Sequence, residues 1–199
     1  MARLDQDVSS AGKWKKLANG KCLIICGNNN EKRTLQLSGS ITVDGGSLQI
    51  HDLILDNKTK NGPTVNLKNG GHILLDNTAV NTVSAKDGTT LQLMRDVTVR
   101  GAVSGKGAVR MTPGAVLHCG GNVTAKTLSF ADADGTQTVS DGSTAGFMLR
   151  KGKKLLIAGD ITTGEGGYFL ITVVDQKDVP ASIKTGTVLV STRYGTAEQ

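Results

Sequence analysis

Acidic and basic side chains recur at similar places in successive segments of this chain. Carboxylates gathered on one exposed strand face can hold Ca²⁺ beside a basic residue, or act as acid and base on a glycosidic bond. The residues with suitable chemistry are Asp44, Asp52, Asp56, Asp76, Arg95 and Lys106. Whether they form a site depends on how the segments that carry them stack on one another.

Two glycine-containing corners set the alignment of these segments. Asp44-Gly45-Gly46 and Asn69-Gly70-Gly71 correspond to each other, which fixes the repeat distance in this part of the chain. On this alignment the stacked pairs are Asp44 with Asn69, Asp52 with Asn77, Asp56 with Asn81, and His51 with Asp76. Only the last pair joins two titratable groups, and one such pair is not an active site. We therefore predict no catalytic residue, and we interpret the Asp and Asn side chains as partners of backbone groups at corners.

Metal binding is not favoured either. His51, His72 and His118 lack the close spacing of a metal-binding pair. His118 adjoins Cys119, but neighbouring strand residues point to opposite faces. Asp132-Ala133-Asp134-Gly135 resembles the start of a calcium loop, yet Asp141 is the sole acidic residue where later ligands would be needed. We expect a tight turn there, with no metal and no cofactor, and the ligand-binding residues remain unknown.

One short phrase returns between Leu35 and Thr163: an alternating aliphatic pair, a polar break and a second alternating pair. Its copies begin with Leu35-Gln36-Leu37, Leu48-Gln49-Ile50, Ile73-Leu74-Leu75, Leu91-Gln92-Leu93 and Leu155-Leu156-Ile157. A unit this short cannot bury its apolar face alone, so its copies must stack as a solenoid.

The phrase predicts an all-β fold, a single-stranded right-handed parallel β-helix. One inward stack should contain Leu37, Ile50, Leu75 and Leu93. The polar partners within the phrases should face outward, and these are Gln36, Thr42, Gln49, Gln92, Thr98 and Thr162. An all-β sandwich used for binding is the alternative fold, but a sandwich has no reason to repeat its strand sequence.

Composition agrees with one folded domain built from many short strands. The chain has 199 residues, 38% of them hydrophobic, 26 glycines and only 3% aromatic residues.

The formal charge of +6 could indicate an anionic partner, but like charges gather only at Lys13–Lys16 and Arg150–Lys154, so we do not expect nucleic acid binding. Apolar runs are strand-sized, which argues against membrane insertion. We expect the three cysteines to be reduced core residues.

The first residues predict a short amphipathic capping helix. Trp14, Leu17 and Ala18 share a helical face within a segment that ends near Asn19-Gly20. The exposed strands at the open end of a solenoid can pair with other chains, so we expect a capping helix whose Trp14 side chain covers the end of the core. We divide the chain into an arm and capping helix (1–20), β-helix coils (21–167), and a terminal coil, C-terminal cap and frayed tail (168–199).

The coil segments resemble a known family. Ser38-Gly39-Ser40-Ile41-Thr42-Val43, the stretch from Gly46 to Asp56 and the stretch from Lys151 to Thr162 look like coils of pectin-lyase-like parallel β-helix domains in large bacterial surface and adhesin-type proteins. The resemblance covers roughly residues 8–165 and carries no invariant motif. It implies a solenoid with three short strands per coil, used as an adhesin shaft or ligand-binding module.

From these features we expect a non-catalytic structural or adhesive β-helix module. The chain would be part of a longer exported bacterial protein, secreted or held at the cell surface, and monomeric as a fragment. Its repeated surfaces would contact a host or bacterial glycan or protein. The alternative is a polysaccharide lyase or hydrolase domain of β-helix type, because pectate lyases and polygalacturonases share this architecture.

Overall fold

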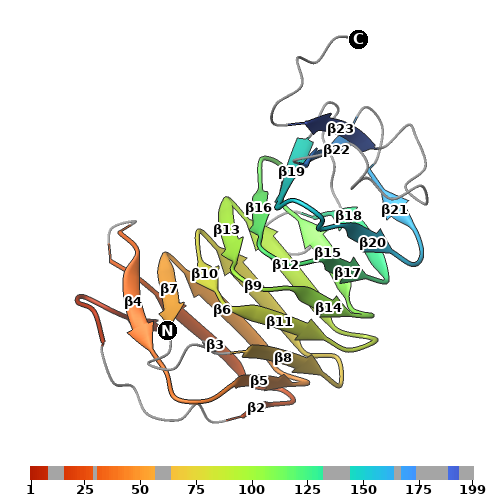
Figure 1. Ribbon diagram of the computed structural model, residues 1–199. Coiled ribbons are helices and arrows are strands. Elements are labelled where there is room, and N and C mark those ends of the chain that lie inside the picture. The colour runs from red at the N-terminus through yellow and green to blue at the C-terminus, as the bar shows by residue number, and fades with distance from the viewer. Residues whose placement is uncertain are drawn as a thin grey trace.

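The chain folds as a parallel β-helix in which the backbone winds through successive coils (Figure 1). A computed structural model describes residues 1–8, 16–28, 31–56, 64–131, 144–163, 167–173 and 188–192. Every regular element within these ranges is a strand. The fold predicted from the repeated phrase is therefore confirmed. Because the strand pairs within the three sheets are all parallel, the sandwich alternative is wrong.

Three parallel sheets, named here A, B and C, line the coils. Sheet A contains β1 (Ala2–Arg3), β3 (Cys22–Cys26), β6 (Ser47–His51), β9 (His72–Asp76), β12 (Thr90–Met94), β15 (Ala108–Met111), β18 (Thr127–Phe130) and β21 (Ile161–Thr162). Sheet B contains β4 (Arg33–Gln36), β7 (Leu53–Asp56), β10 (Ala79–Val80), β13 (Asp96–Val99), β16 (Val116–Cys119), β19 (Thr144–Leu149), β22 (Tyr168–Val173) and β23 (Val188–Thr192). Sheet C contains β2 (Leu17–Ala18), β5 (Ile41–Asp44), β8 (Thr64–Lys68), β11 (Thr82–Ala85), β14 (Val103–Gly105), β17 (Val123–Ala125) and β20 (Leu155–Ile157). Each coil runs from sheet C to sheet A and then to sheet B.

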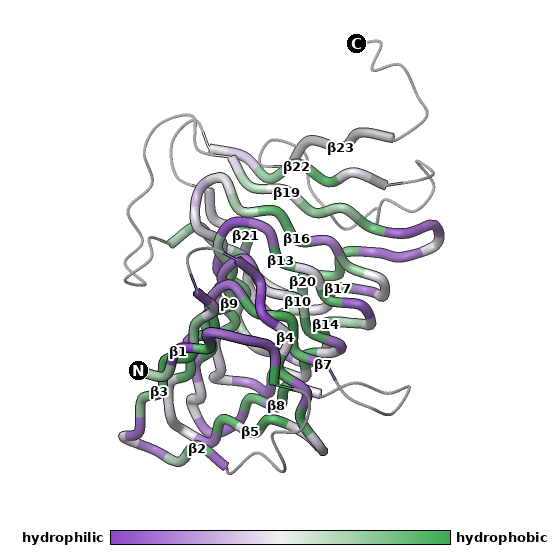
Figure 2. Tube along the Cα trace, turned by 90° about the vertical axis from the view of Figure 1, so that its left-hand side faces the viewer, coloured by the Kyte–Doolittle hydropathy of each residue, from purple (hydrophilic) through white to green (hydrophobic). Residues whose placement is uncertain are grey.

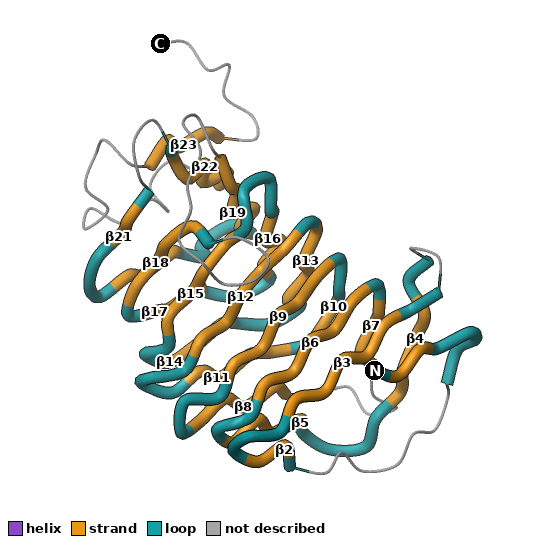
Figure 3. Tube along the Cα trace, turned by 180° about the vertical axis from the view of Figure 1, so that it is seen from behind, coloured by secondary structure: helices purple, strands orange, loops and turns teal. Residues whose placement is uncertain are grey.

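The strand register fixes which residues stack. In sheet A, Cys22 pairs with Ser47 and Ser47 with His72, so these two coils have equal length, the length that the glycine corners predict. The coils that follow are shorter, because His72 pairs with Thr90, Thr90 with Ala108 and Ala108 with Thr127. Leu128 then pairs with Ile161, which makes this coil longer than any before it in sheet A. Strands keep their spacing in space while the corners vary in length (Figure 3).

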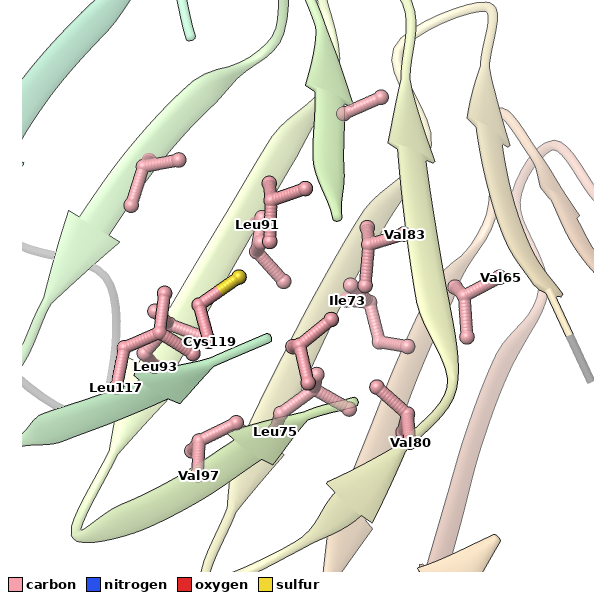
Figure 4. Packing of buried hydrophobic residues seen from close by; sticks show 14 of the residues in the cluster. Val65, Ile73, Leu75, Val80, Val83, Leu91, Leu93, Val97, Leu117 and Cys119 are labelled. Carbon is pink, nitrogen blue, oxygen red and sulfur yellow. The ribbon is translucent and has the colours of Figure 1, made fainter. Parts of the chain in front are cut away.

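The interior is a set of aliphatic columns, several of which are visible in Figure 4. Ile50, Leu75 and Leu93 pair in successive strands of sheet A and are fully buried, as predicted. Leu37 does not belong to this column. Its amide donates to the carbonyl of Asp56, which places it after β4 in sheet B, and Ile25 takes the corresponding position under Ile50. The phrase alone cannot distinguish these sheets because each has the same alternation.

Hydrophobic and hydrophilic residues alternate along the strands (Figure 2), with the polar ones facing outward. The polar row predicted from the sequence lies on the outer side, but Gln92 is only 1% exposed there. On the outer face of sheet A, the column that contains Gln92 lies between the columns that contain His72 and Met94. His72 also shares a hydrogen bond with Gln92. An outward position in this sheet is therefore not always a solvated one.

The predicted N-terminal helix is wrong where the structure describes it, because Leu17–Ala18 forms strand β2. This strand pairs with β5, and the side chain of Leu17 packs against the core. Earlier, β1 pairs with β3, and Val8 bridges to Leu35. The first residues thus follow the coil path through all three sheets. Pairing with an existing coil outweighs the local helical periodicity. Trp14 lies outside the described residues.

The column in sheet A yields a stability prediction. Leu75→Ala removes a fully buried side chain between Ile50 and Leu93, so it should lower the free energy of unfolding by about 2–5 kcal/mol. Leu156→Ala is the control, because Leu156 is 37% exposed. Chemical denaturation should show a much smaller effect for Leu156→Ala. Equal losses for the two variants would contradict the assigned stacking.

Candidate functional site

Polar side chains gather at the corner where the coils pass from sheet A to sheet B. Asp52 connects β6 to β7, Asn77 begins the connection from β9 to β10, and Arg95 connects β12 to β13. All three have positive φ, at 54°, 48° and 53°. Asp and Asn visit this left-handed region more readily than other non-glycine residues, whereas an arginine there is uncommon. A specific set of contacts is needed to hold Arg95 in that conformation.

Arg95 obtains those contacts from the two coils beneath it. Its Nε lies 2.5 Å from Oδ1 of Asp76, and its Nη2 lies 2.9 Å from Oδ2 of the same carboxylate. The same Nη2 is 3.0 Å from Oδ1 of Asp52. Asn77 also donates from Nδ2 to Oδ1 of Asp52, over 2.8 Å. Arg95 therefore bridges three successive coils through a two-point carboxylate pair and a second acidic partner.

His51 completes the network, which we call the corner cluster: Gln49, His51, Asp52, Asp76, Asn77 and Arg95. Nδ1 of His51 lies 2.8 Å from Oδ2 of Asp76, and its Nε2 lies 3.2 Å from Oε1 of Gln49. Both ring nitrogens therefore have oxygen partners. Asp52 and Asp76 are 7% and 5% exposed, so the two carboxylates are removed from solvent.

The surroundings keep Asp76 ionised. Burial alone would raise the pKa of its carboxyl group, but hydrogen bonds from His51 and Arg95 outweigh burial and lower it. The pKa of Arg95 is raised, chiefly by its hydrogen bond with Asp76. An acid with a lowered pKa and both oxygens occupied is a poor general base. The cluster is suited to holding three coils in register.

The sequence predicted part of this cluster. The stacking of His51 over Asp76 and of Asp52 under Asn77 is confirmed, and so is the pairing of Asp44 with Asn69. The statement that only His51 and Asp76 bring titratable groups together is wrong, because Arg95 joins them. The repeat distance set by the glycine corners cannot place Arg95, since the coil from β9 to β12 is shorter than the two coils before it. Aligning Leu91-Gln92-Leu93 with Ile73-Leu74-Leu75 is the signal that would have placed it.

The other candidate residues lie at different corners. Asp56 ends β7, at the passage from sheet B to sheet C. Asp44 ends β5, at the passage from sheet C to sheet A, where it contacts Lys16 at 3.1 Å and Lys68 at 3.4 Å. Hydrogen bonds from Asn69 and then Lys16 lower the pKa of Asp44 to about 2. Lys106 follows β14 at this second corner. The acids that could have formed one site are distributed over three corners.

The described residues contain no group of three His, Cys, Asp or Glu side chains able to hold a metal ion. His72 shares a hydrogen bond with Gln92 at 3.2 Å, and burial lowers the pKa of His72. His118 faces outward and Cys119 inward, as their adjacency predicts. The calcium-loop-like segment from Asp132 to Asp141 lies outside the described residues.

The cysteines differ from the expectation. Only Cys119 is a core residue, and burial raises the pKa of its thiol. Cys22 is exposed and Cys26 partly exposed, because Leu23 and Ile25 take the inward positions of β3.

Comparison of the chain with protein family models, curated proteins and solved structures finds no match. Within the described residues, no helix has the length and apolar character needed to span a membrane.

Asp76→Asn tests whether the corner cluster stabilises the fold. At neutral pH it should lower the free energy of unfolding by about 2 kcal/mol through weakened charge-assisted hydrogen bonds. Because the pKa of folded Asp76 is below its unfolded value of 3.8, its contribution is present above that pH and is lost as pH falls through the folded pKa. The stability of the wild type should therefore fall more steeply below about pH 4 than that of Asp76→Asn.

Asp96→Asn is the matched control for this measurement. Its side chain is 70% exposed and its nearest ionic partner, His118, is 3.9 Å away, so the same chemical change should have little effect. Parallel acid profiles for the wild type and Asp76→Asn would show that the carboxylate does not stabilise the fold.

Proposed function

We propose that this chain is a non-catalytic structural and adhesive β-helix module. The observation that carries the proposal is the saturation of the corner cluster, in which both oxygens of Asp76 accept hydrogen bonds from Arg95 or His51. Hydrolysis of a glycosidic bond needs a carboxylic acid and a second carboxylate across the bond. Here Arg95 joins Asp52 and Asp76 in one ionic network, and the hydrogen bonds to both oxygens of Asp76 argue against its use as a catalytic carboxylate.

The outer faces of the sheets supply what a binding module requires. The coils present outward polar residues in register, among them Thr42 over Asn66 on sheet C and Thr98 beside His118 on sheet B. Such rows repeat at the strand spacing of about 4.8 Å and can hydrogen-bond a repetitive partner. A glycan or protein of the host or of a bacterium is the partner that these rows suit.

The resemblance of the coil segments to pectin-lyase-like domains of bacterial surface proteins supports the remaining parts of the proposal. On that basis the chain acts within a longer exported bacterial protein, secreted or at the cell surface, and is monomeric as a fragment. The sequence context of the gene tests this placement: a signal peptide, further coils or a wall anchor would support it. A cytoplasmic operon without export signals would oppose it.

The proposal predicts no turnover of acidic polysaccharides. Pectin and alginate should keep their chain length in the presence and absence of Ca²⁺, measured by release of reducing ends and by absorbance of unsaturated products. Asp76→Asn and His51→Gln, verified as folded by circular dichroism, provide the comparison. Turnover by the wild type that disappears in both variants would favour the lyase or hydrolase alternative.

A further inference from the structure

Four lysines form a column along the corner between sheets C and A. Lys68 ends β8, while each of the others directly follows β11, β14 or β17. Leu67 pairs with Ala85 and Ala85 with Gly105, so the next residue in each coil is also aligned. The pairing of Val103 with Val123 extends the alignment by one more coil. The lysine column consists of Lys68, Lys86, Lys106 and Lys126, and the corners that carry it are stacked in Figure 3.

The charge of this column is incompletely neutralised. Asp44 lies 3.4 Å from Lys68, and Asp87 lies 2.9 Å from Lys126. Within the described part of the chain, no carboxylate lies at ion-pair distance from Lys86 or Lys106, and both lysines are exposed. Asp87, which pairs with Lys126, also attracts Lys106 over a longer distance. Asp44 is moreover shared with Lys16. The corner therefore keeps an excess of positive charge.

The stability of the fold gives no reason for stacking four lysines in successive coils. Like charges opposite one another on neighbouring strands are destabilising. Three steps of about 4.8 Å place the four ammonium groups along about 14 Å of the solenoid axis. A ligand that carries negative charges at regular intervals would relieve the repulsion and gain from all four lysines.

The surface beside the column is built for hydrogen bonding. In β5, β8, β11, β14 and β17 of sheet C the outward residues in the middle of the strand are short and polar: Thr42, Asn66, Ser84, Ser104 and Thr124. The same column ends at Leu156 of β20. A hollow of about 270 Å³ lies over the lower coils, lined by Thr42, Asn66, Leu67, Lys68, Ser84 and Lys86. These hydroxyl and amide side chains, which we call the polar floor, therefore lie next to the lysine column.

The amino-acid composition of sheet C favours a hydroxyl-rich polyanion over a single-stranded nucleic acid as the ligand. Its seven strands contain no aromatic residue. Single-stranded nucleic acids are bound through aromatic side chains on which bases stack, as well as through cations. A ligand rich in hydroxyl groups, by contrast, matches the polar floor directly.

We propose that the lysine column and the adjacent floor of sheet C bind a linear acidic polysaccharide that lies along the solenoid axis. Its carboxylate or sulfate groups contact the lysines, and its hydroxyl groups contact the threonine, serine and asparagine side chains. The inference rests on the proposed non-catalytic binding function and names the ligand class.

Binding of defined polymers tests the inference. Isothermal titration calorimetry with polygalacturonate, dextran sulfate, neutral dextran and single-stranded poly(dT) covers carboxylate, sulfate, uncharged and nucleic acid ligands. The wild type should bind the two acidic polysaccharides, with affinity that falls as salt rises, and should not bind dextran. Lys86→Gln/Lys106→Gln should weaken acidic polysaccharide binding about tenfold at low salt and roughly halve the salt dependence.

Lys32→Gln/Lys151→Gln is the matched control, because both lysines are exposed and lie at other corners. This control variant should bind like the wild type. The Lys86/Lys106 variant should unfold at the same or a slightly higher temperature, since the substitutions relieve repulsion. Equal weakening in both double variants would show that only net charge matters and would overturn the inference. Tighter binding of poly(dT), or binding of dextran as tight as that of dextran sulfate, would overturn it as well.

The two proposals fail in different ways. Binding of a neutral glycan or a protein, with no response to polyanions, would overturn the lysine column while leaving the module non-catalytic. Cleavage of a polyanion that is lost in Asp76→Asn, together with weakened binding in Lys86→Gln/Lys106→Gln, would overturn the non-catalytic function while supporting the lysine column.

Discussion

In-register hydrogen bonding between successive coils is the constraint on which the rest of this structure depends. Each strand pairs with its counterpart one coil away, so a residue in an inner strand of the described sheets has a neighbour of the same orientation above and below it. Inside, this produces continuous aliphatic columns. Toward the C-terminal end the interior also contains aromatic side chains, and the ring of Phe130 in sheet A stacks on that of Phe169 in sheet B with centroids 4.4 Å apart. A residue that is unsuited to its column therefore affects several coils at once.

The same constraint determines what polar residues can do at the corners. A carboxylate in one coil must lie next to the equivalent residue of the next coil, and a second carboxylate at that position would repel it. Asp52 instead has Asn77 and Arg95 as partners. Asp76 has His51 in its own column, and Arg95 contacts it from the position after Met94, the residue that pairs with Asp76. The groups that look most reactive in the sequence are consequently engaged by one another. In the lysine column, by contrast, carboxylates pair with only Lys68 and Lys126, which makes this column the more informative surface for function.

The sequence predicted the fold from alternation, because a repeated strand phrase has few ways to bury its apolar side. It also predicted those contacts that depend on the repeat distance between the glycine corners, such as Asn69 with Asp44. It failed where the coil length changes, since corner length carries no periodic signal, and Arg95 was separated from its partners for this reason. Leu37 and Cys22 were misplaced because alternation does not reveal which sheet, or which side of a strand, a residue occupies. Leu17 was misplaced because coil pairing acts over a longer range than helical periodicity.

The corner cluster is a structural bridge between coils, and the ion pair of Asp76 with Arg95 is its central contact. A double-mutant cycle combining Asp76→Asn with Arg95→Gln measures this directly, through urea unfolding of the wild type, both single variants and the double variant. A coupling free energy of about 1–3 kcal/mol between the two residues is the predicted result, because each loses its main partner when the other is changed. Additive losses, with a coupling free energy near zero, would show that the two side chains do not stabilise the fold together and would contradict the account.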